Sequence, residues 1–314
     1  MVEPQECTYT TADGSELPLT VWLPEGVRSP MCQAPDPLPL GATKGQGVRS
    51  LTDRAPDPKA AVVYLHGIQS HNQWYEASSR FLAEAGVAVY QVERRGSGRD
   101  AGHARGHVDR AETWLADVHA AAERAIREAG HPRVHLLGVS WGGKLALACV
   151  GERPELYRSL ILSAPGIFPR VDVGLATKLR IVKSLLAGRD LDRFPVPLDD
   201  PHLFTENLAR LRSIAEDPLS LREVTARFLF ESRRLDRLAR DAAARVEAPT
   251  LLALAGTDRI IDNGRTRALV HAMAVRRRVV EYPGTHHTLE FEADPSRYFA
   301  DLAAWVQEAE GGGG

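Results

Sequence analysis

A serine flanked by glycines constrains the fold of this chain more than any other feature of its sequence. It stands in the segment Gly138-Val139-Ser140-Trp141-Gly142-Gly143. An apolar run at 134–139 precedes this serine, and a helical pattern at 142–150 follows it. A sharp turn from a strand into a helix would expose the Ser140 hydroxyl above the end of a sheet, and the start of that helix would favour negative charge. The segment therefore predicts that Ser140 is a nucleophile.

Short apolar runs alternate with helical patterns from residue 60 onward. The predicted strands and helices lie at 61–65, 74–85, 87–92, 109–129, 134–139, 142–150, 159–162, 250–254, 278–282 and 295–309. Repeated β-α units are typical of a mostly parallel sheet with helices on both faces. The alternation of strands and helices stops at about 166–240. This segment has a helical pattern, is rich in leucine and arginine, and contains no obvious strand. We expect an α/β core at 60–165 and 241–310, with residues 166–240 inserted as a helical cap.

Residues 1–59 follow a different pattern. Residues 6–10 and 17–23 alternate as in a β-hairpin that turns at Asp13-Gly14. Residues 24–58 are rich in proline and glycine, and proline cannot donate to a sheet ladder. We expect a long surface loop there, with a flap near the mouth of the site as the alternative. The glycine run at 311–314 predicts a disordered tail.

A nucleophilic serine needs a histidine base that a carboxylate orients. In a sheet of this kind the chain order is serine, acid, histidine, and open α/β sheets build their sites beyond the carboxyl ends of strands. Asp258 lies directly after the strand predicted at 250–254. Asp236 and Asp262 are its rivals, but Asp262 is better suited to the N-cap of the following helix. Asp258 is therefore the predicted orienting acid.

Two adjacent histidines, His286 and His287, follow the strand predicted at 278–282. Neighbouring residues in a loop usually point in different directions, so only one of them is expected at the site. His287 precedes the apolar Leu289 and the acidic Glu290, where a helix is expected to begin. We therefore predict His287 as the base.

An acyl-transfer site also needs two backbone N–H groups that bind the oxyanion. One is expected from Trp141, the residue after the nucleophile. The other is expected from Ile68, in the loop that follows the strand at 61–65. We expect His66, which begins this loop, to orient hydrogen bonds within it rather than to act as a base.

The sequence predicts neither a cofactor nor a metal ion. The segment Arg94-Arg95-Gly96-Ser97-Gly98-Arg99 lacks the Lys-Ser/Thr ending of a phosphate-binding P-loop and the full dinucleotide fingerprint. We expect its arginines to make structural hydrogen bonds. His103 and His107 have no metal-ligand partners at a recognisable spacing.

The composition narrows the classes of partner. With 39 basic and 41 acidic residues the net charge is −2, which gives no general argument for nucleic-acid binding. No apolar stretch approaches the ~20 residues of a transmembrane helix, and no signal peptide is recognisable. The three cysteines, Cys7, Cys32 and Cys149, indicate no disulfide framework or zinc site, and we expect Cys149 to be a buried packing residue. A cytoplasmic location is the resulting expectation.

Together these segments resemble the α/β-hydrolase superfamily, and within it the monoacylglycerol lipase, lysophospholipase and serine aminopeptidase-like group. The resemblance covers about residues 60–308. It rests on Leu65-His66-Gly67, Arg95-Gly96-Ser97-Gly98, the segment around Ser140, Ala255-Gly256-Thr257-Asp258 and Gly284-Thr285-His286-His287-Thr288-Leu289. Glu216-Asp217-Pro218-Leu219 is similar to a short motif in the group's lid. The stretch at 24–58 and the loop Gly67-Ile68-Gln69-Ser70-His71 depart from the common pattern.

The resemblance implies an α/β-hydrolase fold and hydrolysis of carboxylic esters without a metal or organic cofactor. It also points to His287, because the group's catalytic histidine stands just before the Thr/Val-Leu pair. The expected partner is a small-molecule ester, with acyl lipids among the candidates, and the oligomeric state is left open. Cap residues Leu175, Leu179, Val182, Leu185 and Leu186 are expected either to pack a helix on the core or to form an apolar lid over an acyl chain.

Three other functions remain open at this point. An aminopeptidase or amidase would use the same triad, with acidic cap residues such as Glu206, Glu216 or Asp217 holding a substrate ammonium group. An acyltransferase would replace water by an alcohol. A non-catalytic binding protein would keep the fold alone.

Overall fold

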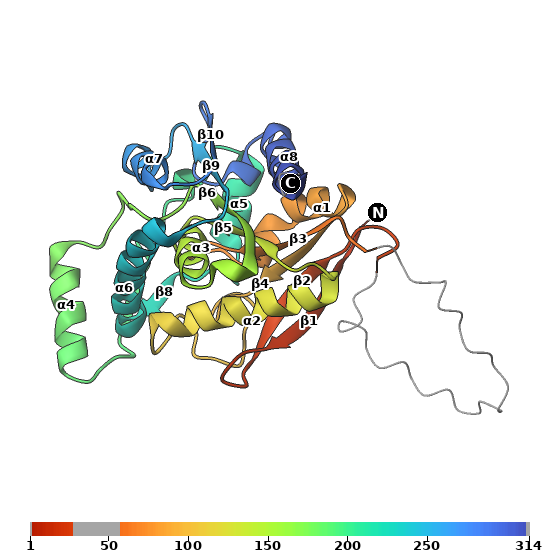
Figure 1. The fold of residues 1–314 in the computed structure, drawn as a ribbon. Coiled ribbons are helices and arrows are strands. Elements are labelled where there is room, and N and C mark those ends of the chain that lie inside the picture. The colour runs from red at the N-terminus through yellow and green to blue at the C-terminus, as the bar shows by residue number, and fades with distance from the viewer. Residues whose placement is uncertain (1, 28–56, 312–314) are drawn as a thin grey trace, which may run out of the picture.

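The computed structural model describes residues 2–27 and 57–311, which build an eight-stranded sheet (Figure 1). The order of its strands is β1-β2-β4-β3-β5-β6-β9-β10. The bounds are β1 Pro4–Thr10, β2 Glu16–Trp22, β3 Ala60–Leu65, β4 Val87–Val92, β5 Val134–Val139, β6 Tyr157–Ser163, β9 Thr250–Ala255 and β10 Arg277–Tyr282. The six strands from β3 to β10 pair in parallel. The predicted fold class, a mostly parallel sheet with helices, is confirmed.

The central strands are apolar because both of their faces are covered. Every residue of β3, β4, β5 and β9 is buried. Parallel strands buried on two faces read as continuous apolar runs, which is the pattern that revealed them in the sequence. Strand β10 lies at the sheet edge and is only partly buried.

The antiparallel end of the sheet is the predicted N-terminal hairpin. Strand β1 pairs with β2, and β2 pairs antiparallel with β4, which attaches the hairpin to the parallel strands. Gly14, in the turn, has a φ of +81°, a conformation that glycine adopts without strain.

Helices cover the two faces of the sheet. Helices α1 (Glu76–Glu84) and α8 (Ser296–Gly311) pack together on one face, and α2 (Ala111–Ala129) and α3 (Trp141–Glu152) pack together on the other. Helix α7 (Asn263–Ala272) lies against β9 and β10. Short 3₁₀ helices cover Asn72–Tyr75, Pro154–Leu156, Pro201–Leu203, Ala243–Arg245 and Leu289–Phe291.

The segment between β6 and β9 interrupts the sheet where the sequence predicted an insertion. It contains α4 (Leu175–Leu186), β7 (Arg193–Pro195), α5 (Leu208–Glu216), β8 (Glu223–Thr225) and α6 (Ala226–Ala242). The expectation of a strand-free segment is wrong, because β7 and β8 pair as an antiparallel ribbon. Each has only three residues, too few to show an alternating pattern. The boundaries predicted for the cap, 166–240, stay a prediction.

Helix α6 packs against α3, and α4 lies on the outer side of α6 (Figure 1). Ile181 of α4 contacts a small apolar cluster with Phe194 and Ala226, separate from the main core. Leu175, Leu179, Val182 and Leu186 are instead exposed, Leu186 to 85%. These four side chains therefore do not pack α4 onto the core.

Several expectations fall partly or wholly outside the described residues. Most of the proline-rich stretch at 24–58 lies there, as do residues 312–314 of the predicted tail, whereas Gly311 ends α8.

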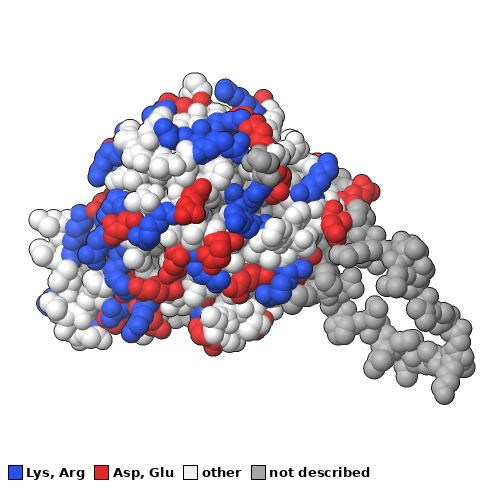
Figure 2. Space-filling model, in the orientation of Figure 1, with Lys and Arg blue, Asp and Glu red and all other residues white. Residues whose placement is uncertain are grey.

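Cys149 is buried and free as expected, but Cys7 is disulfide-bonded, which the spacing of the cysteines did not indicate. In the described ranges no helix is both long and apolar enough to cross a membrane. Basic and acidic side chains are interspersed over the face shown in Figure 2.

Candidate active site

Ser140 occupies the sharp turn between β5 and α3, in a strained backbone conformation. Its φ is 53° and its ψ is −121°, in the region that residues with a side chain rarely adopt. Three hydrogen bonds hold this turn. The Ser140 N–H donates to the Ser163 carbonyl (3.0 Å), and the Ser140 carbonyl accepts from Gly143 (2.9 Å) and Gly166 (2.7 Å). The surroundings therefore fix the strained serine above the carboxyl end of β5.

Gly142 shows why the turn needs glycine. A Cβ atom at this position would lie 2.5 Å from the carbonyl oxygen of Leu65, closer than real Cβ contacts allow. Because that oxygen belongs to the backbone of β3, it could not move aside cheaply. Glycine thus lets α3 begin close to the end of β3.

His287 and Asp258 lie in line with the serine. Nε2 of His287 is 2.7 Å from Ser140 Oγ, and Nδ1 of His287 is 2.8 Å from Asp258 Oδ2. An ionised carboxylate can only accept hydrogen bonds, so Nδ1 carries the proton and Nε2 accepts from the serine hydroxyl. The arrangement can pass the Ser140 proton to His287.

The other oxygen of Asp258 is also engaged. Oδ1 accepts hydrogen bonds from the N–H groups of Ile260 (2.8 Å) and Ile261 (3.0 Å). Burial favours a higher pKa for Asp258, but the charge and hydrogen bond of His287 and the two N–H groups outweigh it and hold the pKa below its ordinary value. Asp258 is therefore held as a carboxylate in a fixed orientation.

The rival residues lie elsewhere. His286 turns to Glu292, with Nδ1 3.1 Å from the Glu292 carboxylate. Asp262 is the N-cap of α7, where its side chain accepts from the Arg265 N–H. Asp236 is paired with Lys144 on α3. Of the candidates weighed from the sequence, only Asp258 and His287 form a continuous hydrogen-bonded chain with Ser140.

The loop after β3 brings Ile68 beside Ser140, and Arg94 fixes that loop. The buried Arg94 side chain donates to the carbonyl groups of Gly67 (2.9 Å) and Ile68 (2.7 Å). Burial lowers the pKa of Arg94 to about 9, which leaves the guanidinium charged at neutral pH. His66 donates through Nδ1 to the Gly67 carbonyl and accepts through Nε2 from the Arg94 N–H. These hydrogen bonds agree with the structural roles that the sequence suggested for His66 and Arg94.

Trp141 is held from several sides. The guanidinium carbon of Arg94 lies 4.6 Å from the centre of the indole ring, and the rings of Phe228 and Trp114 pack against it. Its Nε1 donates to Ser232 Oγ of α6 at 2.9 Å. These contacts fix the side chain of Trp141, and its backbone N–H belongs to the first residue of α3, directly after Ser140.

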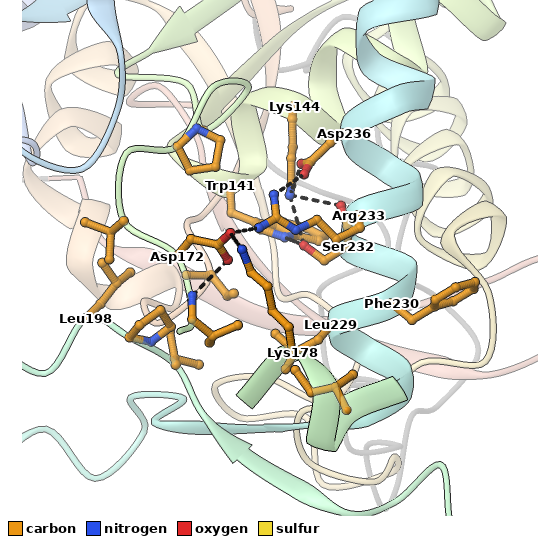
Figure 3. Close-up of a pocket in the computed structure, with 18 of the residues that line it drawn as sticks. Trp141, Lys144, Asp172, Lys178, Leu198, Leu229, Phe230, Ser232, Arg233 and Asp236 are labelled. Carbon is orange, nitrogen blue, oxygen red and sulfur yellow. Dashed lines mark hydrogen bonds and ion pairs between the residues drawn. The ribbon is translucent and has the colours of Figure 1, made fainter. Parts of the chain in front are cut away.

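A cavity of about 320 Å³ opens next to Ser140 and contains Ile68 and Trp141 in its wall. Most of its lining is apolar and comes from the segment between β6 and β9. Figure 3 shows this cavity with α6 beside it. The apolar lining residues include Val171, Val173, Ile181, Leu185, Val196, Leu198, Leu229, Phe230, Ile260 and Ile261. The nucleophile therefore lies at one side of a pocket suited to an apolar group.

A charged cluster forms one part of the cavity wall, and sequence reasoning missed it. Lys144 of α3 pairs with Asp236 of α6 at 2.5 Å, and Asp172 pairs with both Lys178 of α4 and Arg233 of α6 (Figure 3). Burial lowers the pKa of Lys144 despite the nearby Asp236. The residues come from different elements, so no local motif could have indicated the cluster.

Comparison with known proteins places these features in a family. The family described as "Serine aminopeptidase, S33" matches residues 56–294. A monoacylglycerol lipase of Mycolicibacterium smegmatis is 27% identical over 257 residues, which cover 79% of this chain and 88% of that protein. A proline iminopeptidase of Lactiplantibacillus plantarum is 33% identical over 110 residues, covering 34% of this chain and 36% of that protein.

The fold agrees with this family. The structure of a soluble variant of monoglyceride lipase from Saccharomyces cerevisiae has a TM-score of 0.76 at 18% identity, and the match covers 98% of this chain and 96% of that one. At this identity the likeness concerns the fold alone. The family match spans most of the chain, including the segments that carry Ser140, Asp258 and His287, and the resemblance predicted from the sequence is confirmed: the chain belongs to the serine aminopeptidase S33 family of α/β-hydrolases.

Proposed function

We propose that Ser140 is the nucleophile of a carboxylic ester hydrolase, with His287 as its base and Asp258 as the residue that orients His287. The observation that carries the proposal is the chain of hydrogen bonds from Ser140 Oγ through His287 to Asp258, at the edge of an apolar cavity. This order of groups is what activation of a serine hydroxyl requires. The chain is an ester hydrolase, and the roles of these three residues are the proposal.

The reaction proceeds in two acyl-transfer steps. His287 Nε2 takes the Ser140 proton as Oγ attacks the ester carbonyl, and the same proton then goes to the departing alcohol. The resulting acyl-enzyme is attacked by water, whose proton passes to His287 and then back to Ser140. The N–H groups of Ile68 and Trp141 hold the oxyanion in both steps. Arg94 supports this hole because it fixes the Ile68 loop.

The substrate is a small-molecule ester, and we propose an acyl lipid such as a monoacylglycerol. The apolar lining of the cavity suits a hydrocarbon chain, since burial of apolar surface favours binding by about 25 cal/mol per Å². Two of the similar proteins described above are named monoacylglycerol or monoglyceride lipases, which favours the same class of substrate.

Peptide hydrolysis is the second candidate, favoured by the family's name and by the partial match to a proline iminopeptidase. An aminopeptidase needs a free acid to hold the substrate ammonium group. Glu206, Glu216 and Asp217 do not line the described cavity, and Asp217 already accepts from His71 and Trp74. The acids that do line it, Asp172 and Asp236, are ion-paired. These contacts favour esters over aminoacyl substrates.

Transfer of the acyl group to an alcohol would use the same residues, and a binding protein without activity would need none of them. Neither has a specific observation in its favour. A cytoplasmic location stays a prediction.

Fluorophosphonate labelling followed by a panel of substrates tests the proposal. We expect labelling of the wild-type protein at Ser140, hydrolysis of p-nitrophenyl esters with medium or long acyl chains, and slow turnover of aminoacyl p-nitroanilides. A protein that neither labels nor hydrolyses any ester would contradict the proposal. A preference confined to acetate would contradict the acyl-lipid part of it alone.

A further inference from the structure

Ser232 of α6 accepts two hydrogen bonds in the wall of the cavity. One comes from Trp141 Nε1 and the other from Lys144 Nζ, both at 2.9 Å from Ser232 Oγ. A serine hydroxyl has two acceptor lone pairs and one donor hydrogen. Both lone pairs of Ser232 are therefore in use, and only the O–H group is left to bond.

The O–H group of Ser232 has no acceptor within the part of the chain that the structure describes. Lys144 cannot serve, because its ammonium group has no lone pair and donates to the Ser232 carbonyl (3.2 Å), Ser232 Oγ and Asp236 (2.5 Å). Ser232 is only 9% exposed and lines the cavity that contains Ser140. A buried donor without an acceptor costs about 1–3 kcal/mol of stability. A ligand that supplies an acceptor to this donor would therefore bind more tightly.

The neighbours of Ser232 strengthen it as a donor. Hydrogen bonds that an oxygen accepts polarise its own O–H group, and this effect is larger in a poorly solvated site. Here the oxygen accepts from an ammonium group that an ion pair holds in place, and from an indole (Figure 3). The charged residues Lys144, Arg233 and Asp236 share this part of the wall, and apolar residues such as Leu198 and Ile260 line other parts of the cavity. Ser232 is therefore a neutral donor in a wall that combines a charged cluster with apolar side chains.

We infer that the Ser232 hydroxyl binds an oxygen atom within the apolar arm of the substrate, so that the cavity selects esters whose chain carries an ether, keto or hydroxyl oxygen. This inference rests on the proposed function, since it concerns the substrate that Ser140 attacks. The oxygen can belong to the acyl chain or to the alcohol, and both present the same acceptor to Ser232. A few well-placed polar groups in an apolar pocket are the usual source of such selectivity.

Two series of esters test the inference. In the first, an ether oxygen replaces one methylene at a time from C3 to C9 of p-nitrophenyl decanoate, since replacement at C2 would give a carbonate. In the second, hexanoate esters carry the same replacements in a decyl alcohol. An ether only accepts hydrogen bonds, so it reports on a donor in the protein. The measured quantity is the ratio of kcat/KM between each ether ester and its plain parent, which cancels changes that affect both esters alike.

We expect one position in one of the two series to show a ratio that is about five- to tenfold lower in Ser232→Ala than in the wild type, the size of one hydrogen bond. Ser232→Thr keeps the hydroxyl and should restore the ratio. Ser184→Ala is the matched control, because Ser184 is a buried serine of α4 that donates to Asp192 and does not line the cavity. It should leave every ratio unchanged.

If the ratio changes in the decanoate series, Ser232 contacts the acyl chain. If it changes in the decyl alcohol series, Ser232 contacts the alcohol part of the substrate. Ratios that are equal in the wild type and Ser232→Ala at every position of both series would overturn the inference, while hydrolysis of the plain decanoate would still support the ester hydrolase. Failure of the wild type to hydrolyse the plain esters would instead contradict the proposed function. Circular dichroism melting of each variant shows that the comparisons concern folded protein.

Discussion

Nε2 of His287 lies 2.7 Å from Oγ of Ser140, although 147 residues separate the two in the chain. The adjacent His286 has its own carboxylate partner, Glu292. One loop thus presents two histidines in two different electrostatic settings, and only His287 faces the serine. This divergence allows the role of each histidine to be tested separately.

Replacement of His287 or Ser140 by alanine is expected to reduce kcat for a p-nitrophenyl ester by about 10⁴-fold or more, as in other triads that lose the base or the nucleophile. His286→Ala is the matched control. It removes a neighbouring imidazole without touching Ser140, so kcat should stay close to that of the wild type. A larger loss in His286→Ala than in His287→Ala would reverse the assignment.

Arg94 supports catalysis indirectly, through the loop that carries Ile68. Arg94→Lys should lower kcat by about 10²-fold with a small change in KM, because one ammonium group cannot reach both carbonyl groups that the guanidinium binds. Arg95→Lys is the control, since Arg95 pairs with Asp117 instead. Steady-state kinetics separate the two constants. Equal kcat values for wild type and Arg94→Lys would show that the loop keeps its position without Arg94.

The three residues proposed for catalysis could be predicted because each follows the carboxyl end of a buried parallel strand. Ser140 follows β5, Asp258 follows β9 and His287 follows β10. Parallel strands end at one edge of the sheet, so adjacency in space follows from local patterns in the sequence. The oxyanion-hole candidate Ile68 follows β3 for the same reason, and its role stays a prediction.

The cavity wall could not be predicted in this way. Lys144 and Ser232 meet across 88 residues, on helices whose packing angle no periodicity specifies. The ribbon of β7 and β8 escaped notice for a related reason, since three-residue strands carry no alternation. The apolar stripe of Leu175, Leu179 and Leu186 was visible in the sequence, but an amphipathic pattern does not say whether a neighbour covers it.

Leu185 and Leu186 of α4 offer a direct test of the acyl-chain cavity. Leu185 lines the cavity, whereas Leu186 is exposed. Leu185→Trp should fill part of the cavity and lower kcat/KM for long-chain esters by about tenfold, the effect of an overpacked site, while acetate hydrolysis is retained. Leu186→Trp adds the same bulk on the outside and should leave the chain-length profile unchanged. Identical profiles for the two variants would argue that acyl chains bind elsewhere.

Glu290 should make the stability of the protein depend on pH. Its side chain is buried and accepts hydrogen bonds from the N–H (3.0 Å) and hydroxyl (2.5 Å) of Ser78, on α1. Burial raises the pKa of Glu290 from 4.5 to about 7, so the folded protein binds this proton more tightly than the unfolded chain does. The contribution of the protonated form is complete below pH 4.5 and is lost as the pH rises to about 7. The shift corresponds to about 3 kcal/mol of unfolding free energy.

Glu290→Gln removes this titration and keeps groups that can bond to Ser78. Urea unfolding between pH 4.5 and 8 measures the free energy of unfolding of both proteins. The value for Glu290→Gln minus the value for the wild type should increase by up to about 3 kcal/mol as the pH rises through this window. Glu84→Gln, which changes an exposed carboxylate on α1, the helix that carries Ser78, is the matched control and should follow the wild type. A difference between Glu290→Gln and wild type that does not vary with pH would mean that Glu290 stays ionised in the folded protein, with Ser78 compensating for its burial.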